Sequence, residues 1–158
     1  MEPTIELQVQ IASEQTSLPT ETKFILWATT VLEHLDVPSL ELINLCIRVV
    51  DEEEIIELNK NYRNKNTGTN VLSFPQTLPA FLVELTDDNP LGDIVLCAPI
   101  VEREAREQNK ETIAHWAHLT VHGVLHLLDY DHETDKDAAQ MEGLEIAILD
   151  QLGFANPY

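Results

Sequence analysis

The sequence predicts an α+β fold in which a small mixed β-sheet packs against helices. Strand-like segments come early in the chain, helical segments come late, and one helical segment separates the first two strands, a pattern typical of this fold class. The chain has 158 residues, of which 44% are apolar, enough for one domain with a sizeable core. No repeat or linker divides it, so we expect residues 1–158 to form a single domain.

A strand, a helix and a second strand are expected in the first third of the chain. The stretch TIELQVQIA alternates polar and apolar residues, which predicts a strand over residues 4–12. Thr20 is a candidate N-cap for a helix through residues 23–35, KFILWATTVLEHL. Residues 41–50, ELINLCIRVV, are rich in β-branched side chains and predict the second strand.

A second helix is predicted to begin in the acidic run DEEE. Asp51 and Glu54 stand three residues apart, the spacing of a capping box in which each side chain accepts from the other's backbone N–H. Acidic groups in the first turn also suit the positive end of the helix dipole. The buried face of this helix is expected at Ile55, Leu58 and Tyr62.

Two more strands are expected in the middle of the chain. The stretch NVLSF, residues 70–74, predicts a short strand that ends at Pro75. LGDIVLCAP, residues 91–99, predicts a further strand. Residues 76–90 mix prolines, acids and apolar residues, and we interpret them as a loop.

The last third is expected to be helical. Residues 100–108, IVEREAREQ, are amphipathic, whereas residues 112–128 are apolar on nearly all sides and predict a central buried helix. The last helix is expected to end at Gly153. Its apolar face comprises Met141, Leu144, Ile148, Leu149 and Leu152.

Charge and cysteine content limit the class of protein. The net charge of −19 predicts repulsion from nucleic acids and anionic membranes. Six of the nine basic residues nevertheless form two groups: Lys60, Arg63 and Lys65, and Arg103, Arg106 and Lys110. We interpret the second group chiefly as pairing within its own helix. Cys46 and Cys97 lie in apolar runs and are expected to be buried in a protein of the reducing cytoplasm.

Five of the six histidines lie between positions 115 and 132. His122 and His126 are four residues apart, so they share one helix face. His132 can join them only if the chain turns back, and Asp129 is expected to have a positive φ at that turn. Three imidazoles with an open fourth position are typical of a catalytic zinc site. We therefore expect one Zn²⁺ ion at His122, His126 and His132.

A buried helix that carries histidines for structural reasons is the alternative. Burying several unpartnered imidazoles would cost roughly 1–3 kcal/mol each, which favours the metal site. His118, one turn before His122, is a candidate catalytic residue for proton transfer, and Asp131 is a candidate fourth ligand or a partner of a ligand. Zinc proteases with the motif HExxHxxGxxH carry a glutamate base after the first histidine. Gly123 stands there in this chain, which disfavours a peptidase.

A basic segment precedes the histidines. Residues 58–75, LNKNYRNKNTGTNVLSFP, contain Arg63, whose planar guanidinium suits a phosphate group. The alternative role of Arg63 is that of a cation beside the negative end of a helix dipole.

Three segments together resemble the YbeY family of bacterial rRNA maturation endoribonucleases. They are residues 58–75, LGDIVLCAPIVEREA at 91–105 and AHLTVHGVLHLLDYDH at 117–132. The resemblance covers roughly residues 55–152, and its histidine motif is highly specific. The chain departs from the family pattern at three positions: Asn66, Gly68 and Asp129 stand where the family usually has aspartate, proline and glycine.

The resemblance implies a zinc-dependent, single-strand-specific endoribonuclease that acts in 16S rRNA 3′-end maturation and ribosome quality control. It implies that His122, His126 and His132 hold zinc on a zincin-like helix and that Arg63 contacts the substrate phosphate. Its partners would be single-stranded rRNA and the ribosome or ribosomal proteins, in the cytoplasm and without a membrane. The alternatives are a zinc-containing ribosome-assembly factor without nuclease activity and a generic metal-dependent phosphoesterase.

Overall fold

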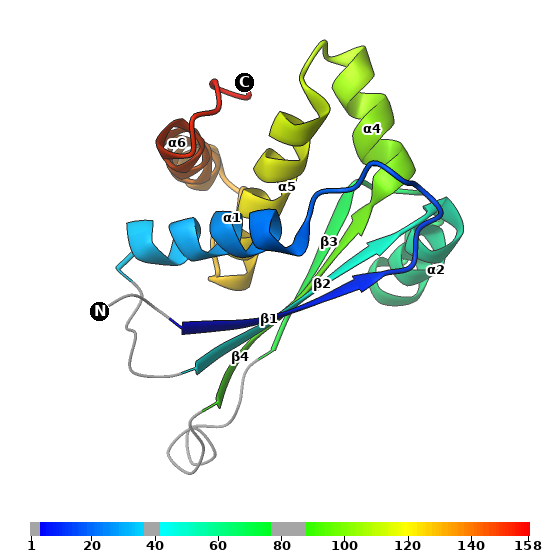
Figure 1. Cartoon of the computed structure of the whole chain (residues 1–158), viewed down its shortest axis with the longest axis horizontal. Coiled ribbons are helices and arrows are strands. Elements are labelled where there is room, and N and C mark those ends of the chain that lie inside the picture. Colours follow the sequence, from blue (N-terminus) through cyan, green and yellow to red (C-terminus); the bar gives the residue numbers. More distant parts are fainter. Residues whose placement is uncertain (1–3, 37–41, 77–87) are drawn as a thin grey trace.

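The computed structural model describes residues 4–36, 42–76 and 88–158. Its elements, in chain order, are β1 (Thr4–Ile11), α1 (Glu21–His34), β2 (Leu42–Val50), α2 (Glu52–Arg63), β3 (Val71–Pro75), β4 (Asp88–Cys97), α4 (Ala98–Glu107), α5 (Thr112–Leu127) and α6 (Asp135–Gln151) (Figure 1). Strands precede most of the helices, so the predicted α+β class is confirmed. Among the described helices, none is both long and apolar enough to span a bilayer.

The sheet is mixed, as predicted. Its strand order is β1-β2-β4-β3. β1 and β4 both run parallel to β2, whereas β3 is antiparallel to β4 and forms one edge. The helix α1 connects β1 to β2, because two parallel neighbours need a crossover connection. The edge strand β3 lies beside the helix that carries the histidines, α5.

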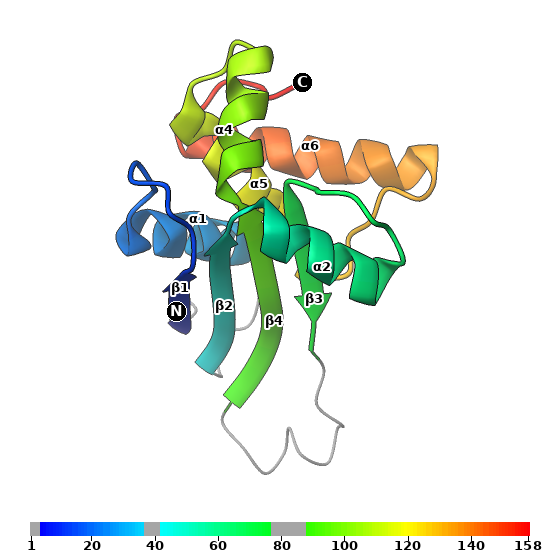
Figure 2. The same ribbon diagram turned by 90° about the vertical axis from the view of Figure 1, so that its right-hand side faces the viewer.

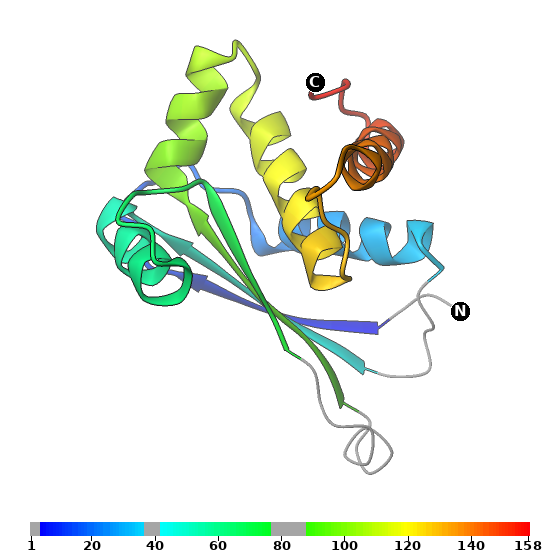
Figure 3. The same cartoon turned by 180° about the vertical axis from the view of Figure 1, so that it is seen from behind.

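Helices cover the two faces of the sheet unequally (Figures 2 and 3). α1 and α5 lie on one face, and α6 packs against these two helices. The larger core fills this side and includes Phe24, Trp27, Ile47, Ile94, Trp116, Leu125 and Ile148. On the other face, α2 covers a smaller cluster that comprises Val50, Ile55, Leu72, Val95, Cys97 and Ile100. The central position of α5 fixes where its histidines emerge.

Most of the predicted elements are present, with shifted ends. Thr20 caps α1 as expected, because its hydroxyl accepts from the backbone N–H of Lys23 at 3.3 Å. The strand expected at 91–99 begins three residues earlier, at Asp88, and ends at Cys97. The start of this strand therefore lies within the loop predicted for 76–90, of which residues 77–87 lie outside the described residues.

The predicted capping box at α2 is wrong. Asp51 does precede the helix, but its carboxylate accepts from the Ser13 hydroxyl at 2.5 Å and from the Glu14 backbone at 3.1 Å. Glu54 forms an ion pair with Arg48 of β2, 2.5 Å from its Nε atom. Long-range partners thus replace the local ones that the spacing suggested. Tyr62 was also wrongly assigned to the buried face, since it is 67% exposed and packs edge-on against Phe74.

Candidate metal centre

The three predicted ligands come from one helix and the turn that follows it. His122 and His126 lie on the last turns of α5. After Leu128 the chain reverses at Asp129, whose φ of 71° confirms the expected left-handed conformation. The backbone N–H of Tyr130 then donates to the carbonyl of Leu125 at 3.1 Å. This turn brings His132 back beside the helical pair.

The three imidazoles converge on one point. One nitrogen from each of His122, His126 and His132 lies within 4.8 Å of the others. The Nε2 atoms of His122 and His126 are 3.0 Å apart. Two nitrogen ligands of a tetrahedral zinc ion stand about 3.3 Å apart, given Zn–N bonds of about 2.0–2.1 Å. Burial and the neighbouring His122 and His132 lower the pKa of His126 to about 4, so it is neutral at pH 7, as a metal ligand must be.

A buried glutamate behind the triad was missed by the sequence analysis. Glu145 of α6 is 1% exposed, and its Oε1 atom lies 3.3 Å from Nδ1 of His122. Burial raises the pKa of Glu145, but hydrogen bonds from His118 and His122 outweigh this effect and lower it to about 2. A signal existed in the sequence: Glu145 falls between Met141 and Ile148 on the apolar face of the last helix, where a lone acid needs buried partners.

The opposite side of the triad faces an open pocket of about 700 Å³. Among the described residues, the histidine cluster contains no fourth protein ligand. The carboxylate of Asp131 accepts from the backbone N–H of His132 at 2.7 Å, and its Oδ1 atom lies 3.6 Å from Nδ1 of His132. Asp131 therefore adjoins a ligand of the predicted site. The donor set suits a metal ion with one position open to the pocket.

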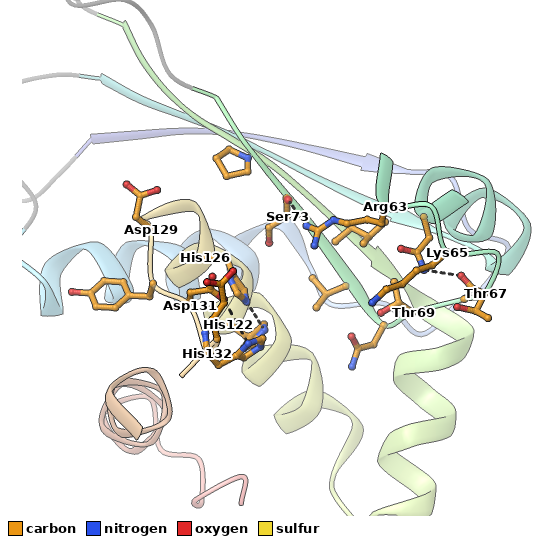
Figure 4. Close-up of a pocket in the computed structure, with 18 residues that line it drawn as sticks. Arg63, Lys65, Thr67, Thr69, Ser73, His122, His126, Asp129, Asp131 and His132 are labelled. Carbon is orange, nitrogen blue, oxygen red and sulfur yellow. Dashed lines mark hydrogen bonds and ion pairs between the residues drawn. The ribbon is translucent and has the colours of Figure 1, made fainter. Parts of the chain in front are cut away.

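Arg63 lines the same pocket on the side away from the histidines, as Figure 4 shows. It is the last residue of α2, and its Nη2 atom donates to the carbonyl of Ser73 on β3 at 3.3 Å. The helix ends there because Asn64 takes a left-handed conformation, with φ 56°. The buried Asn59 then holds the following loop by donating to the carbonyl of Thr67 at 2.9 Å. Local sequence thus fixes the loop that carries Lys65.

The charges in the pocket are divided between its two sides. Arg63 and Lys65 lie on the side of α2, whereas Asp129 and Asp131 lie on the side of the histidines (Figure 4). Glu133, the residue after His132, also lines the pocket. An anionic group is therefore attracted to the side formed by Arg63 and Lys65.

In the second predicted basic group, Arg103 pairs with Glu52 of α2 at 3.4 Å. Among the described residues it has no ion pair with its own helix, so the intrahelical interpretation is wrong for this residue.

His118 lies behind the triad. Its Nε2 atom lies 2.5 Å from Glu145, and its ring borders a second cavity, formed with residues after α6, that contains none of the three ligands. The proton-transfer role expected of His118 stays a prediction.

His115, one turn earlier, pairs with Glu104 of α4 at 2.9 Å. His34 is exposed near the end of α1, with Nδ1 3.2 Å from the amide oxygen of Gln151.

Gly123 faces the sheet rather than the pocket. A Cβ atom at this position would stand 3.0–3.3 Å from the side chain of Ile94. The carbonyl of Gly123 accepts from the hydroxyl of Ser73 on β3 at 3.3 Å. The residue after the first histidine is therefore a packing position in this protein.

Three imidazoles and a guanidinium on opposite sides of one open pocket define the class of metal-dependent hydrolases that act on anionic substrates. The family model described as Endoribonuclease YbeY matches residues 8–153. Two proteins named Endoribonuclease YbeY are similar over nearly the whole chain. That of Pseudomonas savastanoi pv. phaseolicola is 49% identical over 154 residues, covering 98% of this chain and 88% of the relative. That of Colwellia psychrerythraea is 45% identical over 152 residues, covering 96% of each.

The chain belongs to the Endoribonuclease YbeY family, which confirms the resemblance found in the sequence. A solved structure agrees with this assignment. The solution structure of TM1509 from Thermotoga maritima has a TM-score of 0.56 and 28% sequence identity, covering 92% of this chain and 89% of that one.

Proposed function

We propose that this protein is a zinc-dependent, single-strand-specific endoribonuclease that acts in the cytoplasm in 16S rRNA 3′-end maturation and ribosome quality control. Its family is one of endoribonucleases by name. The observation that carries the proposal is the pocket in which the predicted zinc ligands face Arg63. RNA cleavage needs a phosphodiester to be held and its developing charge stabilised, and these two groups supply both functions.

In the proposed site His122, His126 and His132 hold the zinc ion. The bound ion supplies Lewis-acid polarisation of a phosphate oxygen and a lowered pKa for water. Arg63 and Lys65 bind and orient the phosphate on the other side of the pocket. The hydrogen bond from Arg63 to the carbonyl of Ser73 uses only one of its five N–H groups, so the remaining donors can hold a phosphate oxygen.

The acidic composition limits how this site can bind RNA. The net charge is −19, and three carboxylates line the pocket near the histidines. At about 0.15 M salt, charges more than about 8 Å apart are largely screened, so a local pair of cations can still hold a phosphate. Free RNA is nevertheless expected to bind weakly. We propose that the ribosome or a ribosomal protein presents the RNA and that the acidic residues after position 133 favour a basic partner.

The number of ligands supports an enzyme over a zinc-stabilised assembly factor. Structural zinc sites are normally closed by four protein ligands. The cluster in the described residues has three, and its remaining side borders the pocket. The peptidase alternative lacks support because Gly123, at the position of the protease base, packs against Ile94.

Cleavage of a 16S 3′-end precursor RNA by the zinc-loaded protein and an Arg63→Ala variant tests the proposal. Loss of a donor to the reacting phosphate is expected to lower the cleavage rate by about 10²–10³. Lys60→Ala is the matched control, because Lys60 is an exposed cation on the same helix that does not line the pocket. Equal cleavage by the wild type and Arg63→Ala would contradict the role of Arg63 or reveal a contaminating nuclease.

A further inference from the structure

Glu145 is a buried acid that the proposed chemistry at the pocket does not use. It projects from α6, and the residue is 1% exposed. A carboxylate in such a place is stable only when its oxygens accept several hydrogen bonds. The partners of Glu145 come from two other parts of the chain: α5 and the segment after α6.

Three side chains donate to this carboxylate. His122 approaches Oε1 through Nδ1 at 3.3 Å, and His118 approaches Oε2 through Nε2 at 2.5 Å. The Tyr158 hydroxyl lies 3.0 Å from both oxygens. Burial and the charge of Glu145 raise the pKa of Tyr158, so its hydroxyl remains protonated and donates.

These contacts fix the tautomer of His122. A carboxylate accepts only from a protonated nitrogen, so Nδ1 of neutral His122 carries its hydrogen and Nε2 carries a lone pair. This is the Nε2 atom that lies 3.0 Å from Nε2 of His126 within the metal cluster. Histidine ligands in metal sites are commonly held by a carboxylate in this way.

Tyr158 is itself held in place. The segment after α6 is anchored by Lys110, whose Nζ donates to the carbonyl of Pro157 at 2.7 Å. The Tyr158 ring packs edge-on against His118 at a centroid distance of 5.4 Å. The segment thereby brings the Tyr158 hydroxyl to the carboxylate of Glu145.

We propose that Glu145 is a positioning residue of the metal site, which holds His122 with its Nε2 lone pair directed at the ion, and that His118 and Tyr158 hold Glu145. The inference rests on the proposed zinc site at His122, His126 and His132. It assigns a role in metal affinity to a residue outside the pocket and to the segment that ends in Tyr158.

A Glu145→Gln variant tests this role because an amide has one accepting oxygen and one donating nitrogen. It cannot accept from His122 and His118 together. If its nitrogen faces His122, that ring loses the Nδ1–H tautomer. If it faces His118, that ring must carry its hydrogen on Nδ1, which is buried and has no hydrogen-bond partner. In both cases the negative charge behind the ligand is lost.

The measurement is the zinc dissociation constant of the full chain, obtained by competition with a chelator. Glu145→Gln is expected to weaken zinc binding about 10–100-fold, the usual effect of losing such a partner. Tyr158→Phe is expected to weaken it less. Glu104→Gln is the matched control. Glu104 of α4 pairs with His115, which lies on α5 like His122 but is not one of the predicted ligands. The zinc affinity of this control is expected to equal that of the wild type.

A second measurement separates positioning from general stability. Nitrogen NMR of the metal-free protein is expected to show the Nδ1–H form of His122 in the wild type and in Glu104→Gln, and a mixture of tautomers in Glu145→Gln. Unchanged zinc affinity together with an unchanged tautomer in Glu145→Gln would overturn the inference. If that variant does not fold, an Nε2–H form of His122 in the wild type would overturn the role of the carboxylate, and unchanged zinc affinity in Tyr158→Phe would overturn the role of the segment. A wild type that binds no zinc would refute the zinc site itself.

Discussion

Gly123 on α5 lies so close to Ile94 on β4 that a Cβ atom at position 123 would stand 3.0 Å from the Cγ2 atom of Ile94. The contact sets the distance between the sheet and the helix that carries His122 and His126. Because Ile94 is fully buried, it has little room to move away. The neighbouring positions 122 and 126 then direct their imidazoles toward the pocket that Arg63 borders.

Substitutions at two helical glycines should therefore have opposite effects. Gly123→Ala is expected to lower the free energy of unfolding by about 1–2 kcal/mol, because overpacking outweighs the gain in helix propensity. Gly143→Ala in α6 should raise it by about 0.5–1 kcal/mol, since a Cβ there meets nothing within 4 Å. Urea unfolding of the metal-free variants measures both. Stabilisation by both alanines would show that Ile94 can move aside.

The turn after α5 contains a residue in a strained conformation. Asp129 has a φ of 71°. Glycine adopts this left-handed conformation without steric cost, whereas for residues with a Cβ atom it is unfavourable by about 1–2 kcal/mol. Asp129→Gly is expected to raise the free energy of unfolding by up to about 1 kcal/mol, and Asp129→Ala to lower it. Asp135→Gly in the first turn of α6 is the control and should destabilise. A loss of stability in Asp129→Gly would mean that the aspartate side chain makes a compensating contact.

The buried thiol of Cys97 should be inert. Burial raises its pKa to about 11, and the side chain is 0% exposed. A raised pKa reduces the fraction of Cys97 present as the reactive thiolate. At pH 8 that fraction would be about one in a thousand. Alkylation at pH 8, followed by mass spectrometry, should leave Cys97 unmodified in the folded protein and modify it in urea. Reactivity should rise as pH approaches 11. Rapid labelling of Cys97 in the native protein would contradict its burial.

The clustering of His122, His126 and His132 could be predicted from the sequence because its geometry is local. The four-residue spacing of His122 and His126 places them on one face of any helix, and Asp129 marks the reversal that returns His132. Glu145 could not be paired with them in the same way, because its partners depend on how α6 packs against α5. The apolar spacing around it indicated burial without showing which donors it meets.

The same distinction explains the incorrect predictions in the fold. The capping box at α2 assumed that Asp51 would bond locally, whereas Ser13, from the segment after β1, lies close enough to donate to it. Tyr62 fits the helical spacing of the buried face, but its ring is 67% exposed and lies edge-on against Phe74. Tertiary packing decides such positions, and it is not encoded in spacing.

Zinc reconstitution of the metal-free protein tests the central claim most directly. Cleavage of a single-stranded 16S 3′-end precursor RNA should be absent without metal, rise with added zinc and level off at one equivalent. His126→Ala, which lacks one of the three predicted ligands, should show no cleavage at any of these zinc concentrations. The claim that a three-histidine zinc site catalyses the cleavage would be contradicted if cleavage persisted after metal removal. Cleavage by His126→Ala would contradict it as well.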